Sequence, residues 1–145
     1  MNERLLVARF KHRYGSLAIV VAYAPINDAQ DQDKTDFYET LEAAMRLTKQ
    51  SDLIVCLGDF DAVMGTSWTV PGVVVLFGSG TLNGNTERLI NFCAGANLSV
   101  CGSQSRRKDI HRDTWFSNDG LTKKEIDDIL VNNMWRAITS YRVYR

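Results

Sequence analysis

Two short apolar runs separated by a segment with helical periodicity limit what this chain can fold into. Residues 16–23 (SLAIVVAY) and 52–57 (DLIVCL) are rich in β-branched residues, as is typical of buried strands. The order strand, helix, strand predicts an α/β domain in which a helix covers a sheet. The helix is predicted over 33–50, where apolar residues recur at helical spacing at Phe37, Leu41, Ala44, Met45 and Thr48.

Further elements in the first two thirds of the chain follow from turn and cap residues. Residues 5–10 are expected to pair with the first strand through a turn at 13–16. Residues 65–85 hold five glycines, at 65, 72, 78, 80 and 84, and little periodicity, which predicts a long surface loop with one short strand at most. A second helix is predicted from a cap at Asn85 to about Asn97.

The last third of the chain predicts strands and a hairpin. Residues 98–102 (LSVCG) are expected to form a strand. The turn residues at 118–120 (Asn-Asp-Gly) predict a hairpin between 113–117 (DTWFS) and 125–131 (EIDDILV). A final strand is predicted at 138–144.

The net charge excludes few classes of function, because 17 basic and 17 acidic side chains cancel. The distribution says more, since an excess of positive charge at both ends flanks a more acidic middle. Such clusters are one signature of nucleic-acid binding. The basic residues at the ends are Arg4, Arg9, Lys11, Arg13, Arg106, Arg107, Lys108, Arg112, Lys123, Lys124, Arg136, Arg142 and Arg145.

Cysteine usage and hydropathy favour a protein of a reducing compartment. Cys56, Cys93 and Cys101 are an odd number, and two of them lie in apolar runs, so we expect buried thiols. No apolar stretch approaches the length of a membrane span, and no leader sequence is recognisable. We therefore expect a nuclear or cytoplasmic protein with no membrane partner.

Two acidic pairs are candidates for chemistry. Asp59 and Asp61 follow a buried strand, and at i and i+2 of an extended chain they would converge on one cation or one attacking water. The alternative is a structural turn after the strand. Asp127 and Asp128 lie inside an apolar strand, where alternation turns one of them inward. An inward carboxylate needs a metal, a histidine or a donor network, unless the pair flanks a bulge or an edge.

Four motifs in order give the chain a family resemblance. They are Tyr23-Ala24-Pro25, Gly58-Asp59-Phe60, Thr114-Trp115 and the segment 126–131. With ERLINFC at 87–93 and KDIH at 108–111, the chain resembles the nuclease domains of LINE-type retrotransposons and craniofacial development protein 2-like proteins, within the endonuclease/exonuclease/phosphatase superfamily. The resemblance covers nearly all of residues 1–145, as a single, incomplete domain. It implies a DNase I-like fold, a four-layered α/β sandwich of two packed mixed sheets with outer helices.

The resemblance also implies roles for particular residues. Tyr23 would contact the scissile phosphate, and Asp59 would position or deprotonate the attacking water. Asp61 stands where the family has an asparagine that holds phosphate and water, so with Asp59 it is a candidate metal ligand. Asp127 would orient a histidine. The resemblance further implies substrate binding by Asn27, Thr114 and Trp115, DNA as the partner, and Mg²⁺, or alternatively Mn²⁺, as the cofactor.

Departures from the family pattern lead us to expect impaired activity. The family's metal-binding glutamate and its Ser-Asp-His histidine have no match, and neither His12 nor His111 replaces the latter. Asp61 places a negative charge beside a phosphate, which costs several kcal/mol at about 4 Å if the effective dielectric constant is near 20. Missing strands would favour a homo-oligomer or a partner that completes the fold.

The sequence therefore predicts a DNA-nicking phosphodiesterase domain of a retrotransposon-derived protein. The alternative is an inactive remnant that binds nucleic acid or protein through its basic ends and the loop around Trp68. Trp68, Trp115 and Trp135 are candidates for base stacking or, alternatively, for packing. A phosphoesterase acting on small substrates is a third alternative, which the LINE-like segments disfavour.

Overall fold

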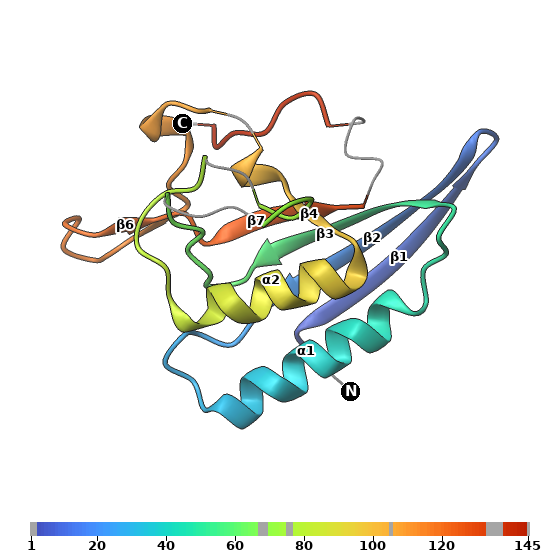
Figure 1. Ribbon diagram of the computed structural model, residues 1–145, viewed down its shortest axis with the longest axis horizontal. Helices are drawn as coiled ribbons and strands as arrows, with labels where there is room; N and C mark the ends of the chain where they lie inside the picture. Colours follow the sequence, from blue (N-terminus) through green and yellow to red (C-terminus); the bar gives the residue numbers. More distant parts are fainter. Residues whose placement is uncertain (1–2, 67–69, 75–76, 105, 133–137, 145) are drawn as a thin grey trace.

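The protein is a mixed α/β structure in which two helices lie against one face of a twisted five-stranded sheet (Figure 1). The computed structural model describes residues 3–66, 70–74, 77–104, 106–132 and 138–144. Strand order in the main sheet is β1-β2-β3-β7-β4, and β5 and β6 form a small second sheet that projects from it. The elements are β1 Leu5–His12, β2 Gly15–Tyr23, α1 Asp31–Met45, β3 Asp52–Asp59, α2 Gly84–Ala96, β4 Ser99–Val100, β5 Trp115–Phe116, β6 Lys123–Lys124 and β7 Asp127–Val131, with 3₁₀ turns η1 Cys101–Ser103 and η2 Asp109–His111.

The predicted strand-helix-strand unit is confirmed. β1 and β2 form an antiparallel hairpin, and β2 then runs parallel to β3 through the crossover helix α1. The helix α1 begins two residues before the predicted start and ends at Met45, five residues before the predicted end. The C-terminal ends of β2 and β3 therefore lie side by side, with Tyr23 next to Asp59.

The hydrophobic core lies between the sheet and the two helices. Val20, Cys56 and Leu130 face it from adjacent strands, and Leu41 and Leu89 face it from α1 and α2. The three cysteines are buried and reduced, as expected of buried thiols. In the described part of the chain, no helix is long and apolar enough to cross a bilayer.

The second helix starts earlier than predicted because a different asparagine caps it. Asn83, not Asn85, precedes the first turn, and its side chain accepts from the Thr86 backbone N–H in a capping box. Asn85 instead points inward, with 1% of its surface exposed, and donates to the carbonyls of Pro25 and Phe60. Asn85, the predicted cap, thus hydrogen-bonds two loops from a buried position.

Three expectations about the last third are wrong in part. Residues 115–116 pair with Lys123–Lys124 around the predicted turn, while β7 pairs with β3 and β4 in the main sheet. The strand expected at 98–102 narrows to β4, because the chain turns into η1 at Cys101. No strand forms over 138–144, where the Val143 N–H donates to the His111 carbonyl of a loop. The described residues of 65–83 form the predicted loop, with an isolated bridge between Val70 and Val74, whereas Gly84 and Asn85 belong to α2.

Candidate functional site

Three predicted site residues form a row across the main sheet. Tyr23 on β2 lies opposite Asp59 on β3, and Asp59 lies opposite Asp127 on β7. Directly opposed residues project from the same face of a sheet, with Cβ atoms about 4.5–5.5 Å apart. Tyr23 is 55% exposed and the two aspartates are half-buried, so all three side chains are reachable from solvent. The sheet therefore brings together residues separated by more than a hundred positions.

Backbone hydrogen bonds hold the ends of these strands together just beyond the row. The Ala24 N–H donates to the Asp59 carbonyl at 2.8 Å, and the Phe60 N–H donates to the Ile126 carbonyl at 3.0 Å. Phe60 itself is fully buried. The apolar residue inside the Gly-Asp-Phe motif thus anchors the turn that presents Asp59.

The pKa of Asp59 is raised by its surroundings. Partial burial raises its pKa above the ordinary aspartate value, and the negative charges of Asp127 and Asp61 raise it further. The Asp61 backbone N–H, which donates to Asp59 Oδ1 at 2.9 Å, opposes the rise. A carboxylate with a raised pKa and solvent access can accept a proton from a bound water.

Asp61 does not converge with Asp59 by extended alternation, so that part of the prediction is wrong. The chain leaves the strand at Asp59, and Asp61 adopts a left-handed conformation with φ of 43°. Asn and Asp tolerate this region best among residues with a side chain. Its Oδ2 accepts from the Asn27 N–H at 2.5 Å, and its carbonyl accepts from Asn83 Nδ2 at 2.6 Å. Asp61 therefore joins three loops beside the row.

Asn27 lies at the centre of this loop junction. Its Oδ1 accepts from the Asn85 N–H at 3.2 Å, and its carbonyl accepts from Lys34 Nζ at 3.0 Å. Asn83 and Asn85 were not predicted to belong to the site. Asparagines at the start of α2 indicated a helix cap, but cap preference alone does not predict which loops these side chains will hydrogen-bond.

Thr114 and Trp115 flank the row from the β5–β6 hairpin. Thr114 Oγ1 accepts from the backbone N–H groups of Ile126 and Asp127, at 3.2 and 3.3 Å. Trp115 is 41% exposed, and Lys124 Nζ lies 5.6 Å from its ring centre. Thr114 thus fixes the start of β7, and Trp115 offers an accessible aromatic face. Trp68 and Trp135 lie outside the described residues.

The two histidines have neighbours other than Asp127 in the described contacts. His12 ends β1 at the hairpin, and one ring nitrogen of His111 contacts the Val143 carbonyl at 3.1 Å. The Asp127 carbonyl accepts from the Tyr141 hydroxyl at 3.0 Å, and the guanidinium of Arg107 stacks on the Tyr141 ring. The C-terminal segment therefore supports β7 at the position of the row.

Asp128, the neighbour of Asp127, points to the opposite face and is 3% exposed. Burial raises its pKa well above the ordinary value, and the negative charge of Glu125 adds to the rise. Glu125 is itself buried against Arg107 and Arg112. The predicted alternation is confirmed, and the inward aspartate faces charged side chains rather than a histidine.

The row offers ligands for a divalent cation of the kind the family implies. Asp59 and Asp127 present carboxylate oxygens on one face, and their mutual repulsion is what a cation would relieve. Mg²⁺ is commonly held by one or two carboxylates, with water and substrate phosphate completing its shell. Among the described residues no cluster of three or more His, Cys, Asp or Glu is present. The two carboxylates therefore fit a cation whose remaining ligands are water and substrate phosphate.

Solved structures share the architecture that carries this row. The endonuclease domain of TRAS1, a telomere-specific non-LTR retrotransposon, matches 92% of the chain with a TM-score of 0.61 and 13% identity. The 3′ phosphatase NExo from Neisseria, solved with a product DNA hairpin, matches 92% with a TM-score of 0.64 and 17% identity. The chain covers 52% and 54% of these two structures. The fold is that of the endonuclease/exonuclease/phosphatase proteins.

The chain is also similar in sequence to craniofacial development protein 2. Craniofacial development protein 2 from Bos taurus is 31% identical over 136 residues, which is 94% of this chain. The homologous protein from Tragulus javanicus is 30% identical over the same length. The chain spans 23% and 24% of the length of these relatives. No family model matches the chain. The resemblance to craniofacial development protein 2 and to this fold is thus confirmed.

Proposed function

We propose that the chain acts as a metal-dependent phosphodiesterase unit that nicks DNA, with Mg²⁺ or Mn²⁺ as the cofactor. The observation that carries the proposal is the cross-strand row of Tyr23, Asp59 and Asp127. The bound cation would supply charge neutralisation at the phosphate oxygens, and Asp59 and Asp127 are the residues that would hold it. The similarity to nucleases and phosphatases of the same fold supports the assignment.

Each side chain near the row has a role in this proposal. Tyr23 donates a hydrogen bond from its hydroxyl to a non-bridging phosphate oxygen, and Asp59 orients the attacking water and accepts its proton. The bond between phosphorus and the leaving sugar oxygen breaks, and that oxygen takes a proton from solvent. Asp61 acts by fixing the Asn27 loop, which faces the substrate. Thr114 holds the start of β7, so that Asp127 stays opposite Asp59. Trp115 and Lys124 contact the nucleic acid through stacking and charge.

Nicking of supercoiled plasmid tests the proposal. Asp59→Asn keeps an oxygen that can accept from the Asp61 N–H but cannot take up a proton from water, so we expect the rate to fall by roughly 10²–10⁴-fold. Asp36→Asn, on the exposed surface of α1, is the matched control and should retain the rate. Nicking that persists in EDTA, or that falls equally in both variants, would refute the proposal.

A second candidate is a nucleic-acid-binding module without catalysis. It is favoured by Asp61, whose carboxylate adds negative charge where a phosphate would approach, and by exposed Trp115 beside Lys124. Such a module would bind DNA with steep salt dependence and equal affinity with and without Mg²⁺. DNA binding without any cation-dependent nicking would select this candidate over the first.

A further inference from the structure

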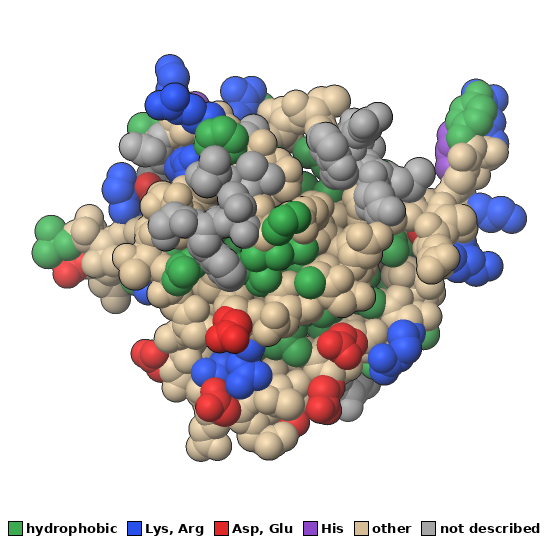
Figure 2. Space-filling view, in the orientation of Figure 1, with side chains coloured by type: hydrophobic (Ala, Val, Ile, Leu, Met, Phe, Trp, Pro, Cys, Tyr) green, Lys and Arg blue, Asp and Glu red, His purple; other side chains and the backbone are tan. Residues whose placement is uncertain are grey.

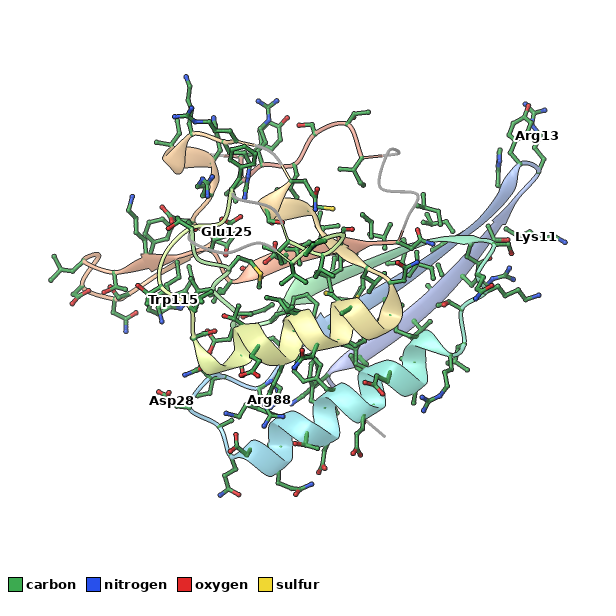
Figure 3. The ribbon with its side chains drawn as sticks, viewed as in Figure 1. Lys11, Arg13, Asp28, Arg88, Trp115 and Glu125 are labelled. Carbon is green, nitrogen blue, oxygen red and sulfur yellow. The ribbon has the colours of Figure 1, made fainter. Side chains whose placement is uncertain are left out.

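Both ends of the chain are rich in Lys and Arg, but these residues have different surroundings at the two ends. Figure 2 shows Lys and Arg side chains over the segment around η2 and along the β1–β2 hairpin, with acidic side chains gathered near α1. On the hairpin, Arg9 is bound to Asp52, and Lys11 and Arg13 lie at the exposed tip (Figure 3). Around η2 the cations instead line a cavity.

This cavity has a volume of about 750 Å³ and is formed by two segments distant in sequence. Residues 77–80 form one wall, and residues 106–108 with Arg112 form the other. Four cationic side chains line it, and the described residues that line it include no carboxylate. Its lining residues are Thr66, Phe77, Gly78, Ser79, Gly80, Arg106, Arg107, Lys108 and Arg112.

Two of the four cations are built into the protein. Arg107 donates to the Gly102 carbonyl and to Glu125, and Arg112 donates to the Gly78 carbonyl at 2.9 Å. Both guanidinium groups lie near the single carboxylate of Glu125. Their bonds to Glu125 and to backbone carbonyls fix both guanidinium groups at the floor of the cavity.

The other two cations lie at the rim. Arg106 and Lys108 are exposed, and they alternate with inward-facing Arg107 along the chain. Ser79 and Thr66 add hydroxyl groups to the same lining. Charged donors on an exposed rim above two fixed guanidinium groups suit a phosphate oxygen, which accepts several charge-assisted hydrogen bonds.

A neighbouring cavity extends the positive lining toward the hairpin. This second cavity, of about 410 Å³, shares Ser79, Gly80 and Arg112 with the first and is also lined by Lys123 and Lys124. Two carboxylates also line it, buried Glu125 and half-buried Asp113, which pairs with Lys123 at 3.3 Å. Cations spread over two adjoining cavities fit an extended polyanion better than a single small anion.

We propose that the cavity lined by residues 77–80, 106–108 and Arg112 binds a backbone phosphate of a nucleic-acid strand, through residues other than the row of Tyr23, Asp59 and Asp127. The phosphodiester is held by Arg106 and Lys108, and the strand continues past Arg112 toward Lys123 and Lys124. Such a contact positions the strand and carries no sequence preference. The choice of nucleic acid as the ligand rests on the proposed function.

The test compares two double variants that remove the same charge. Arg106→Ala with Lys108→Ala alters the cavity rim. Lys11→Ala with Arg13→Ala alters the hairpin tip, which lies at the opposite end of the molecule from Glu125 in Figure 3. Binding of a labelled short DNA duplex is measured by anisotropy in EDTA over a series of KCl concentrations. We expect the cavity variant to bind about tenfold more weakly at low salt, with a salt slope smaller by about two. The hairpin variant should keep the slope of the unaltered chain.

Equal losses in the two variants would overturn the proposal, because general electrostatic attraction would then explain binding. Displacement of the duplex by inorganic phosphate at constant ionic strength would also overturn it, by showing a site for a small anion. Both pairs are exposed, and matching thermal unfolding of the two variants verifies folding. Because the assay contains no divalent cation, its outcome is separate from that of the nicking test.

Discussion

Asp127 and Asp128 are adjacent in sequence but lie in opposite environments on the two faces of β7. Asp127 shares a half-exposed face with Asp59 and Tyr23, whereas Asp128 is buried on the helix-covered face beside Glu125 and Gly102. Strand alternation alone produces the difference. It teaches that one acidic pair can supply a reactive carboxylate and a structural carboxyl group at the same time.

The largest expected effect comes from replacing each of the two aspartates by asparagine in a separate variant. Asp127→Asn should lower the plasmid nicking rate by about 100-fold, because the pair of carboxylates that would hold the cation is broken. Asp128→Asn should change the rate less than about threefold, since the buried amide does not reach the row. Equal losses in initial rate would show that the two faces do not differ in function.

Gly58 shows how tightly the buried face is packed at the same level of the sheet. A Cβ at this position would lie 1.7 Å from the Ala22 carbonyl oxygen, and φ is 153°. We expect Gly58→Ala to destabilise the protein by about 3 kcal/mol or more. Gly95→Ala is the matched control, because its Cβ would meet nothing within 4 Å, and in a helix it should stabilise by about 0.5–1 kcal/mol. Urea denaturation measures both, and a Gly58→Ala variant as stable as the control would contradict the packing.

The buried face should also determine how stability depends on pH. The pKa of Asp128 is raised in the folded state, so its contribution is complete below the unfolded pKa near 4 and is lost as pH rises toward the folded pKa. Asp128→Asn removes this titration. We expect the variant to gain stability relative to the unaltered chain as pH rises from 4 to 7, measured by urea denaturation. A constant difference across this range would mean that Asp128 does not titrate upon unfolding.

The smallest expected effect is a shift in the titration of Asp59. The negative charge of Asp127 helps to raise the pKa of Asp59, although burial is the larger cause. Asp127→Asn should therefore lower the pKa of Asp59, and Asp36→Asn should leave it unchanged. Carboxyl carbon chemical shifts followed across a pH series measure both. An Asp59 pKa that does not move would place the two carboxylates too far apart to share a cation.

Much of the sheet could be predicted from sequence because its strands are short, apolar and β-branched. Alternation also predicted that one of Asp127 and Asp128 would point inward. The pairing of β7 could not be predicted, since turn residues at 118–120 suggested a hairpin partner, whereas burial of Leu130 and Val131 is achieved beside β3 and β4. Tertiary packing therefore overrode the local turn signal.

The position of Asp61 could not be predicted from the sequence either, because it depends on backbone conformation and long-range contacts. Spacing of two residues predicts a shared direction only in extended chain, and the left-handed φ of Asp61 removes that condition. Its hydrogen bonds to Asn27 and Asn83 join segments 34 and 22 positions away. Neither contact has a local sequence signal, whereas the row across β2, β3 and β7 follows from strands that were largely predicted.

Binding of Mn²⁺ followed by paramagnetic broadening of backbone amide resonances tests most directly whether the exposed face of β3 and β7 is the functional one. The proposal predicts broadening centred on Tyr23, Asp59 and Asp127, and its loss in Asp59→Asn. Broadening centred instead on the acidic start of α1, at Asp31 and Asp33, would contradict the assignment of the row as the metal-dependent site.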